Sequence, residues 1–509
     1  MIQWIENNSG KFFLFLLLLI LFLLGFQVYL FLQPIGIHYV RQTDSLAFVD
    51  FYQNNGFNFF EPGGWFLGDS NGKTAGEFPV LYYITAILDS FLGSKHVVLR
   101  TLTFTISVVG FYHLFKLSKL LLKEVSYSIG MTLLLLSSTV ILYYSVNLLP
   151  DASALGLTLS AYYFGLKNHL KGEKADLEKA MILFSFAGLL KVTFLIHPIA
   201  LVFALFLMDL KSTKSFNQSL KANTKRFMAL ALVLLIVSSW YIYAQWYNQV
   251  NNSNVFLTRI LPIWELNSTR IARIWLAIRH DWFSAYYYQT TFHVLLILIS
   301  FGLFIRYRQL SFFSILLVVL GIGSLAYVLL FFNQFLDHDY YMLNVAPFLF
   351  LLVLFSFQKL IVQFKPYSVH FIPKILVFLL VGLSFYYACN KLNGRYTIVS
   401  EVHEKNVSSL VGIDAHLDKM SVPKNAKFAV IGEENYNGAF YWMNRSGWIA
   451  KPSVSGSKEK MLMDRQKTME YVMLMPGFEG LDLKNFPLVG KYKGIKIYRN
   501  KQFIESDPS

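Results

Sequence analysis

Long apolar runs alternate with short polar segments along most of this chain. A membrane-spanning helix needs about 20 apolar residues to cross roughly 30 Å of hydrocarbon, and this criterion gives about eleven candidate spans. They lie near residues 12–32, 98–116, 126–146, 151–167, 178–191, 193–210, 227–247, 291–306, 311–332, 341–362 and 370–388. The first run is longer than the apolar part of a signal peptide and no small-residue cleavage site follows it, so we expect a retained anchor. The pattern predicts a multi-span α-helical membrane protein.

The pattern changes after residue 389. Three short segments of the C-terminal part are apolar or alternate between apolar and polar residues, which is typical of β-strands. They lie at 427–432, 470–475 and 492–498, and the last one predicts an edge strand at a glycine turn. We therefore expect a membrane domain over residues 1–389 and a small extramembrane α/β domain over residues 390–509.

A polar segment, residues 33–97, follows the first apolar run. Its glycines lie between aromatic stretches, at Gly56, Gly63, Gly64, Gly68, Gly72 and Gly76. This spacing predicts short helices that lie on the membrane surface and are joined by tight turns. Residues 79–89 are too short to span a membrane and are predicted to form one of these interfacial helices.

Composition excludes a water-soluble protein. Hydrophobic residues make up 55% of the chain and charged residues 15%, and 48 of the 509 residues are phenylalanine. A soluble protein would have too little polar surface to cover such a core. The net charge of +15 is expected to collect in cytoplasmic loops in a membrane protein, so we expect no nucleic-acid partner.

Charge also predicts the topology. If the N-terminus is cytoplasmic, each of the five inner loops carries two or more lysines or arginines, as the positive-inside rule requires. These loops are Lys116–Lys123, Lys167–Lys179, Lys211–Arg226, Arg306–Arg308 and Lys359–Lys374. The same topology places residues 33–97 and 390–509 on the outer side. The phenylalanine-rich and lysine-rich composition favours a bacterial inner membrane, whose outer side is the periplasm.

Ionisable residues gather on the predicted outer side, where a reaction at the membrane surface would need them. The chain has no nucleotide-binding glycine motif, and the predicted cytoplasmic loops are too short to fold into a domain that holds a nucleotide sugar. A reaction at the outer face, without ATP, needs a donor that carries its own leaving group. The sequence therefore favours a lipid donor such as a polyprenyl-phosphate sugar.

Six short motifs together resemble a known family. They are Arg41-Gln-Thr-Asp44, Asn58-Phe-Phe-Glu-Pro62, Glu77-Phe-Pro79, Pro150-Asp151, Lys191 within an apolar run, and His338-Asp-Tyr-Tyr341. Over about residues 10–390 the chain resembles the membrane glycosyltransferases of the GT-C fold, in the branch of glycosyltransferase family 39 similar to protein O-mannosyltransferases and the aminoarabinose transferase of lipid A. The resemblance implies sugar transfer from a polyprenyl-phosphate carrier to a lipid, glycan or protein acceptor at the outer face, usually with inversion. The protein O-mannosyltransferases carry Asp-Glu where this chain has Asp44-Ser45, which weakens the implication of a protein acceptor.

The resemblance assigns the catalytic role to carboxylates. An inverting transfer needs a base that takes the proton of the acceptor hydroxyl while the phosphate leaves from the opposite face of the sugar. Asp44 is the candidate base, and the alternative is a structural ion pair with Arg41 one helical turn away. Glu77 and Asp151 are further catalytic candidates, whose alternative roles are those of a helix cap and a helix-start residue.

The leaving phosphate needs cations and hydrogen-bond donors. Lys191 interrupts an apolar run, where a charge costs about 2.5 to 3.5 kcal/mol unless it faces a polar cavity. A lipid phosphate would pair with it, and the alternative is snorkelling to the membrane surface. The other candidates for donor or substrate binding are Arg41, Arg259, Arg270, His338, Asp339 and Tyr341. Solvated loop arginines and an interfacial aromatic belt are the alternatives for several of these residues.

The reaction implied by the resemblance requires no organic cofactor, and the carboxylates would also suit a divalent cation such as Mg or Mn. The partners expected are a polyprenyl-phosphate-linked sugar, its acceptor and membrane lipids. The alternative functions are a transporter or flippase of lipid-linked sugars and a non-catalytic envelope-assembly protein. A transporter built from repeats would show broken helices in matching positions, and the sequence contains no internal repeat.

Overall fold

The computed structural model describes residues 2–256, 260, 262–305, 311–368, 370–397, 407–451, 456–478 and 486–503. The chain divides into two compact units. The helical unit comprises Met1–Phe31, Arg100–Ile242 and Arg259–Gly394, and the α/β unit comprises Leu32–Leu99, Tyr243–Thr258 and Arg395–Ser509. The candidate residue Arg259 and the predicted inner loop Arg306–Arg308 lie outside the described residues.

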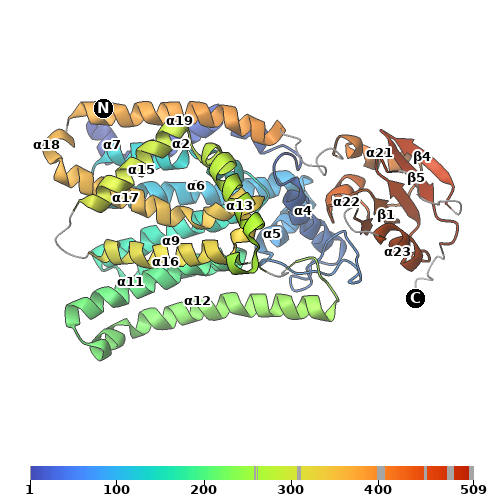
Figure 1. Cartoon of the computed structure of the whole chain (residues 1–509), viewed down its shortest axis with the longest axis horizontal. Helices are drawn as coiled ribbons and strands as arrows, with labels where there is room; N and C mark the ends of the chain where they lie inside the picture. The colour runs from blue at the N-terminus through green and yellow to red at the C-terminus, as the bar shows by residue number, and fades with distance from the viewer. Residues whose placement is uncertain are drawn as a thin grey trace. The chain divides into compact units, whose positions relative to one another are not determined.

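The helical unit is built from long apolar helices and short connecting ones (Figure 1). Its helices are α1 (Ile2–Asn7), α2 (Ser9–Leu23), α3 (Phe26–Tyr29), α6 (Lys95–Leu122), α7 (Val125–Leu136), α8 (Thr139–Ser145), α9 (Asp151–Lys171), α10 (Lys174–Leu190), η1 (Val192–Leu195), α11 (Ile196–Thr213), α12 (Phe216–Val250), η2 (Ile263–Glu265), α13 (Ser268–Ala277), η3 (Ile278–Trp282), α14 (Phe283–Tyr286), α15 (Gln289–Phe304), α16 (Phe312–Leu330), η4 (Phe332–Leu336), η5 (Asp339–Asn344), α17 (Ala346–Gln363), α18 (Lys365–Ser368) and α19 (Phe371–Thr397). The first residues of α6 and the last residues of α12 and α19 belong to the α/β unit.

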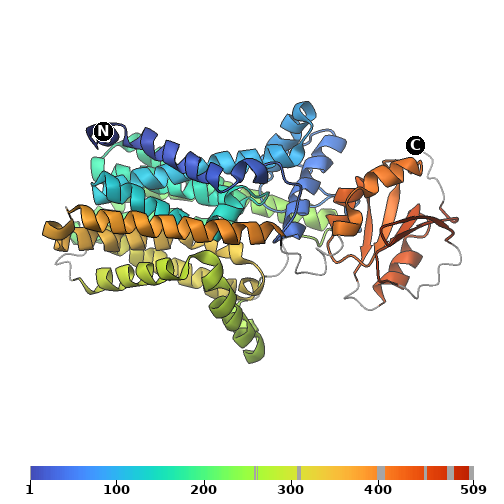
Figure 2. The same ribbon diagram turned by 90° about the horizontal axis from the view of Figure 1, so that it is seen from above.

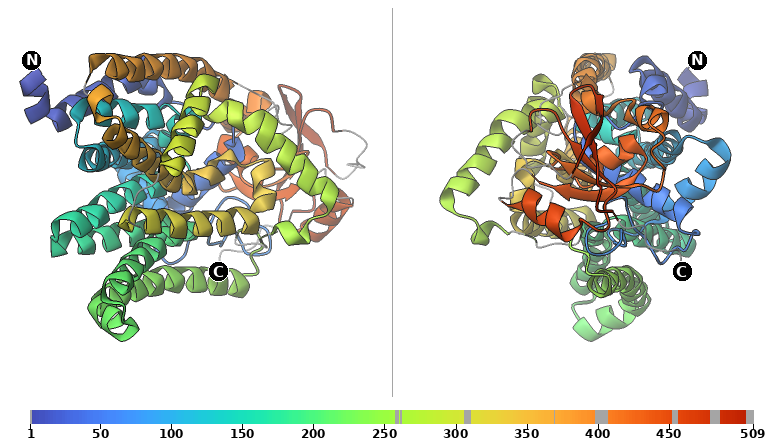
Figure 3. Two further views of the ribbon diagram at one scale, coloured as in Figure 1. Left: turned by 60° about the vertical axis from the view of Figure 1, so that its left-hand side comes forward. Right: turned by 90° about the vertical axis from the view of Figure 1, so that its right-hand side faces the viewer.

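The multi-span helical class predicted from the hydropathy pattern is confirmed. Among the described residues, six helices are long and apolar enough to cross a membrane, and two bent helix pairs raise the number to eight. One of these pairs, Ser268–Tyr286 with Gln289–Phe304, is bent by 101° (Figure 3). The predicted number of eleven is higher because it also counts α2, α9 and α10, of which α2 and α10 have only 15 and 17 residues and α9 is less apolar. Length and composition therefore support up to eight spans.

Small residues allow helices of the helical unit to approach closely. A Cβ atom added at Gly110 of α6 would lie 2.3 Å from the Cα atom of Gly156 in α9, and one added at Gly302 of α15 would lie 2.2 Å from the Cβ atom of Ser356 in α17. Association of helices in lipid depends on such contacts, because lipid tails are as apolar as the helix surfaces. These positions fix how α6 packs on α9 and how α15 packs on α17.

The α/β unit contains a five-stranded sheet in the order β2-β1-β3-β5-β4 (Figure 2). The strands are β1 (Lys427–Ile431), β2 (Ser446–Ala450), β3 (Tyr471–Leu474), β4 (Leu488–Tyr492) and β5 (Ile495–Arg499). The first three are parallel, connected by α22 (Gly438–Met443) and α23 (Ser457–Asp464), while α21 (Ile413–Lys419) precedes β1. β1 is buried beyond its first residue and β3 is buried throughout, as expected of parallel strands covered on both faces.

The predicted strands at 427–432 and 470–475 are confirmed as β1 and β3, whereas the prediction of an edge strand at 492–498 is wrong. β5 lies inside the sheet, between β3 and β4. β4 has no counterpart among the predicted strands, and it pairs with β5 across a turn in which Gly494 has φ +84°. The alternation of β5 arises because the apolar residues Ile495 and Ile497 are buried, while the residues between them are partly exposed.

Two further helices belong to the α/β unit and pack on each other. They are α4 (Tyr39–Asn54) and α5 (Val80–Leu92). α5 corresponds to the helix predicted over residues 79–89. Between them, Gly63 and Lys73 form an isolated antiparallel bridge. Gly72 has φ +83°, and a Cβ atom there would lie 2.6 Å from the carbonyl oxygen of Gly64, so this turn requires glycine.

Candidate functional site

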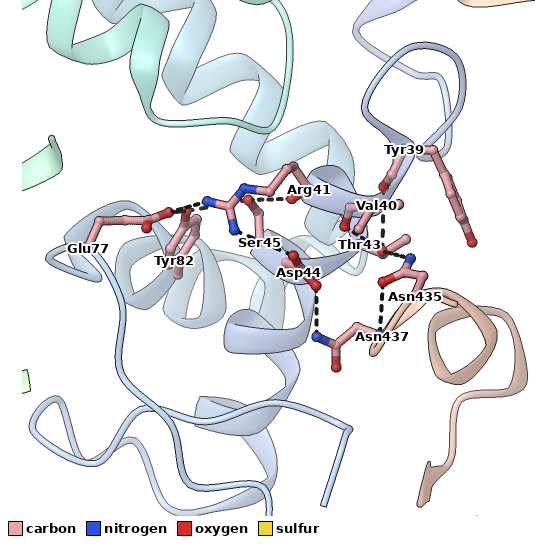
Figure 4. A network of polar contacts seen from close by, with 10 residues as sticks. All are labelled: Tyr39, Val40, Arg41, Thr43, Asp44, Ser45, Glu77, Tyr82, Asn435 and Asn437. Carbon is pink, nitrogen blue, oxygen red and sulfur yellow. Dashed lines mark hydrogen bonds and ion pairs between the residues drawn. The ribbon is translucent and has the colours of Figure 1, made fainter. Parts of the chain in front are cut away.

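Helix α4 presents Arg41 and Asp44 on one face, because residues three apart lie one above the other on a helix. The Nη1 atom of Arg41 lies 3.4 Å from Oδ2 of Asp44 (Figure 4). The side chain of Asp44 is 10% exposed and that of Arg41 is 20% exposed. The ion pair considered as an alternative to the catalytic role therefore exists, and it leaves both groups with some access to solvent.

Glu77 joins this pair from the loop that leads into α5. Its Oε1 atom lies 3.1 Å from Nη2 of Arg41 and accepts a hydrogen bond of 2.8 Å from the hydroxyl of Tyr82. The ring of Tyr82 stacks on Phe48, with 5.3 Å between ring centroids. One guanidinium thus serves two carboxylates, and the cluster has a net charge of −1 when both are ionised.

The β1–α22 loop supplies the remaining contacts of this cluster. The Nδ2 atom of Asn437 donates to Oδ1 of Asp44 at 2.9 Å, and its Oδ1 atom accepts from the backbone N–H of Phe66 at 3.2 Å. Asn435 accepts from the backbone N–H of Asn437 and donates to Thr43 at 3.1 Å (Figure 4). We refer to Arg41, Asp44, Glu77, Tyr82 and Asn437 as the Asp44 cluster.

Sequence reasoning missed both asparagines. A signal was present, because they follow a buried parallel strand, and loops at the carboxyl ends of such strands are the usual location of functional side chains in α/β folds. Here the loop is used to orient Asp44. The other missed residue, Tyr82, carries no sequence signal beyond its position in the first turn of α5.

Burial raises the pKa of Asp44 above its ordinary value, while the positive charge of Arg41 and the hydrogen bond from Asn437 oppose the rise. The negative charge of Glu77 adds to it. A carboxylate with a raised pKa is a stronger proton acceptor than an ordinary aspartate, provided that it is ionised at the working pH. The environment of Asp44 therefore suits a general base.

A second cluster lies in the helical unit. α9 and α10 pack on each other as consecutive helices, so the start of α9 and the end of α10 come together. The Nζ atom of Lys191, in the extended residue after α10, lies 3.2 Å from Oδ1 of Asp151, the first residue of α9. The side chain of Asp151 is 3% exposed, and its Oδ2 atom has no hydrogen-bond partner among the described residues. A buried carboxylate oxygen without a protein partner is costly unless a ligand or water binds it.

Aromatic residues of η5 cover this ion pair. The Nζ atom of Lys191 lies 5.2 Å from the ring centroid of Tyr341 and 5.5 Å from that of Tyr340. We refer to Asp151, Lys191, Tyr340 and Tyr341 as the Lys191 cluster. The structure thus brings together three residues predicted from separate motifs.

The neighbouring candidates Asp339 and His338 support these tyrosines. Oδ1 of Asp339 accepts a 2.5 Å hydrogen bond from the hydroxyl of Tyr144, and the ring of His338 stacks on Tyr341 at 5.8 Å. The hydroxyl of Tyr286 donates to the backbone carbonyl of Asp339. These contacts indicate that Asp339 holds η5 in place beside Lys191.

An apolar groove of about 660 Å³ begins next to η5. Met342 and Leu343, which directly follow Tyr341, line it together with Tyr286 and with side chains of α15 and α17. Its lining is almost entirely apolar, so the groove suits a hydrocarbon chain and not a polar ligand.

Arg270 does not join either cluster through its described hydrogen bonds. Its Nε atom donates to Oδ1 of Asn333 at 3.0 Å, and its backbone N–H donates to the capping side chain of Asn267.

A metal site would need several ligands close together. Among the described residues, no group of three or more His, Cys, Asp or Glu side chains could hold a metal ion. Binding of Mg or Mn therefore stays a prediction without an assigned site.

Known proteins match this chain in two ways, through a family model and through solved structures. The family model described as dolichyl-phosphate-mannose-protein mannosyltransferase matches residues 75–243. No curated protein matches the chain.

Solved structures match almost the whole chain. The crystal structure of ArnT from Cupriavidus metallidurans in the apo state has a TM-score of 0.60 and 12% identity, with 98% of both chains covered. ArnT from the same organism bound to undecaprenyl phosphate has a TM-score of 0.61 and 11% identity, with 98% of this chain and 100% of that chain covered. At such identity the likeness shows the fold. The resemblance to membrane glycosyltransferases of the GT-C fold is thereby confirmed.

Proposed function

We propose that this chain, a membrane protein with the GT-C fold, is a glycosyltransferase that moves a sugar from a polyprenyl-phosphate carrier to an acceptor hydroxyl at the outer face of the membrane. The family model over residues 75–243 and the fold shared with ArnT, which binds undecaprenyl phosphate in one of the matched crystal structures, support the reaction class and the carrier. The chemistry is assigned to individual residues from their own geometry.

The Asp44 cluster is the observation that carries the proposal. A segment with only a structural role would not need two carboxylates around one guanidinium, with Asp44 almost buried. Asn437 and Arg41 each hold one oxygen of Asp44, which fixes the direction of the carboxylate. Such fixed orientation is what a base requires to act in line with a leaving group.

In the proposed reaction, an acceptor oxygen attacks C1 of the sugar and forms the new glycosidic bond. The bond between C1 and the phosphate oxygen breaks from the opposite face, so the configuration at C1 inverts. Asp44 takes the proton of the acceptor hydroxyl, and polyprenyl phosphate leaves with the bonding electron pair. Glu77 holds Arg41 in position, and this keeps a positive charge beside Asp44 when it is ionised.

The Lys191 cluster is assigned to the donor. Lys191 supplies a cation for the phosphate, while the open Oδ2 atom of Asp151 can accept a hydrogen bond from a sugar hydroxyl or from water. The apolar groove beside η5 suits the first isoprene units of the carrier. Tyr340 and Tyr341 separate the charged pair from hydrocarbon, since their rings cover the Lys191 ammonium.

The first test is the release of polyprenyl phosphate from a panel of polyprenyl-phosphate sugars by the purified protein in lipid nanodiscs, with membrane extract supplied as the acceptor. We expect Asp44→Asn to reduce the rate about 10² to 10⁴-fold, because the substitution removes a general base but keeps the shape of the side chain. Glu459→Gln is the matched control, since Glu459 is an exposed carboxylate in the first turn of α23 of the same unit and lies outside the motifs of the resemblance.

The control variant is expected to release polyprenyl phosphate at the wild-type rate. Equal rates in wild type and Asp44→Asn would remove Asp44 from the mechanism. An equal loss in both variants would attribute the effect to folding, and the thermal unfolding of each variant reports this independently.

A further inference from the structure

The α/β unit contains a polar pocket lined by none of the residues assigned to the proposed reaction. It is an open depression of about 1250 Å³ at the end of α12, lined by residues of 245–256 and by Asp69. Its walls carry the carboxamides of Gln245, Gln249, Asn252 and Asn254. All four residues are exposed, and none of these carboxamides has a side-chain hydrogen bond to another described residue.

Hydrogen bonds connect the floor of the pocket to the segment before Glu77. Asn248 receives a 2.7 Å hydrogen bond from the backbone N–H of Ala75 and donates one of 2.9 Å to the carbonyl of the same residue. Ser253 donates to the hydroxyl of Thr74 at 2.7 Å. The end of α12 is therefore fastened to the segment that leads to Glu77, while the four carboxamides stay available for a ligand.

The lining favours a neutral ligand rich in hydroxyl groups. A carboxamide both donates and accepts hydrogen bonds, which matches a sugar hydroxyl that does the same. An anionic ligand is disfavoured, because the C-terminal end of a helix carries partial negative charge, and the carboxylate of Asp69 is neutralised by its ion pair with Arg465. No lysine or arginine is among the residues that line the pocket; Arg465 reaches it only by pairing with Asp69.

One aromatic residue connects the pocket with the Asp44 cluster. Phe256 lines the pocket, and its ring centroid lies 5.7 Å from Cζ of Arg41 and 5.4 Å from the ring of Phe48. Its ring offers an apolar face next to the carboxamides, a combination that suits the apolar face of a pyranose. A glycan bound there would extend toward Arg41.

We propose that this amide pocket, comprising Gln245, Gln249, Asn252, Asn254 and Phe256, binds a neutral glycan and holds the acceptor for transfer. The role as acceptor site rests on the proposed glycosyltransferase function, whereas binding of a neutral saccharide does not. Of the acceptors considered, namely a lipid, a glycan or a protein, this pocket favours a molecule that presents uncharged sugar residues.

Saccharide binding tests the pocket without any donor. The full-length protein in lipid nanodiscs is examined by saturation-transfer NMR with mannobiose, chitobiose, maltose and lactose, and with glucose 6-phosphate as the anionic comparison. The double variant Gln249→Ala/Asn254→Ala removes two carboxamides, and Gln218→Ala removes an exposed one at the other end of the same helix. Asp44→Asn serves as a variant that lacks the proposed base.

We expect at least one neutral saccharide to bind to wild type, Gln218→Ala and Asp44→Asn alike. Its dissociation constant should rise about tenfold or more in the double variant, as the loss of two hydrogen bonds implies. Glucose 6-phosphate should bind more weakly than the neutral ligand. Absence of binding by every neutral saccharide, or equal binding by the double variant, would overturn the inference.

The two proposals fail in different ways. Release of polyprenyl phosphate by wild type without saccharide binding leaves the transferase proposal in place and rejects the pocket. Pocket-dependent saccharide binding without any release rejects the transferase, and with it the acceptor role. In a working enzyme, the double variant should raise the KM for a glycan acceptor about tenfold and leave kcat within about twofold of wild type.

Discussion

Asp44 and Asp50 lie on the same helix, are both buried, and have different environments. Asp50 forms a 2.5 Å ion pair with Lys95, whose ammonium is also covered by the rings of Trp65 and Tyr441. The ion pair of Asp44 is looser, because its Oδ2 atom lies 3.4 Å from Nη1 of Arg41 and the same guanidinium also pairs with Glu77. Asp50 therefore has the environment of a structural residue, and Asp44 that of a functional residue kept at some expense of stability.

Removal of the Asp44 charge should stabilise the protein at neutral pH. Because its pKa is raised in the folded state by burial, folded wild type binds this proton more tightly than the unfolded chain does. The stability of wild type then falls as pH rises from the ordinary aspartate value of 3.8 through the raised pKa, and this loss is constant above it. We expect Asp44→Asn to have a higher Tm than wild type at pH 7, with a difference that shrinks toward pH 4.

Asp50→Asn is the matched comparison for this measurement. Burial also raises the pKa of Asp50, but the charge and the hydrogen bond of Lys95 oppose the rise. Substitution of Asp50 leaves the Lys95 ammonium, which is 22% exposed, without this partner, and we expect the free energy of unfolding to fall by about 1 to 3 kcal/mol. Thermal unfolding of wild type and both variants between pH 4 and pH 8 checks both expectations. A lower Tm for Asp44→Asn at every pH would show that Asp44 is a structural residue like Asp50.

At the residue scale, sequence predicts what is local. Arg41 and Asp44 were recognised because they lie within one motif, and Glu77 because a second motif follows closely. Asn437 contacts Asp44 from 393 positions away along the chain, and no local pattern specifies which distant loop will reach α4. Burial of the carboxylate predicts that some donor must be present, but not which one.

The α9–α10 pair shows how elements assemble a site from distant motifs. Asp151 begins α9 after Pro150, and Lys191 ends α10 in an extended conformation with φ −153° and ψ 106°. Two consecutive helices that pack side by side run in opposite directions. The first residue of α9 therefore lies next to Lys191, the residue that follows α10. Lys191 separates α10 from η1, and α11 follows η1 directly.

This geometry predicts energetic coupling between the two residues. Lys191→Met should raise the KM for the donor about tenfold or more, because the cation for its phosphate is lost, and Lys191→Arg should retain most of the affinity. In a double-mutant cycle with Asp151→Asn, the stability effects should show a coupling of about 1 to 3 kcal/mol. Additive effects, or a donor KM unchanged by Lys191→Met, would assign Lys191 to snorkelling at the membrane surface.

At the element scale, the predictions succeeded where the apolar pattern was long or fully buried. β1 and β3 were found because parallel strands covered on both faces appear as continuous apolar runs. β4 was missed because its residues are exposed or partly exposed. Without β4, β5 appears to lie at the edge, and this explains the wrong prediction.

For the whole molecule, hydropathy determines the class and charge suggests the topology. The helical unit has helices over the predicted runs, and up to eight of these are spans by length and composition. The positive-inside rule predicts a cytoplasmic N-terminus. The eleven predicted spans, an odd number, place the C-terminal residues outside, whereas eight spans would place both ends on the same side. The structure contains no membrane, so the orientation stays a prediction. The pairing of helices in the GT-C fold depends on close contacts such as Gly110 with Gly156, which hydropathy does not encode.

Cysteine labelling tests this orientation. The chain has one cysteine, Cys389, so Cys389→Ser provides a background for Lys467→Cys in the C-terminal part and Lys221→Cys in a predicted inner loop; both lysines are exposed. A membrane-impermeant maleimide added to intact spheroplasts should label the first and spare the second until the membrane is permeabilised. The reverse pattern would invert the topology.

The central claim is that the chain breaks the bond between a sugar and polyprenyl phosphate, and the fate of a doubly labelled donor tests it most directly. Purified wild-type protein in proteoliposomes is given polyprenyl-phosphate sugars labelled separately in the sugar and in the lipid, with membrane extract as the acceptor, and both labels are followed by mass spectrometry. We predict that free polyprenyl phosphate appears in step with sugar on the acceptor. Donor that crosses the bilayer intact, or stays unchanged with every sugar, would contradict it and favour a transporter or an assembly protein.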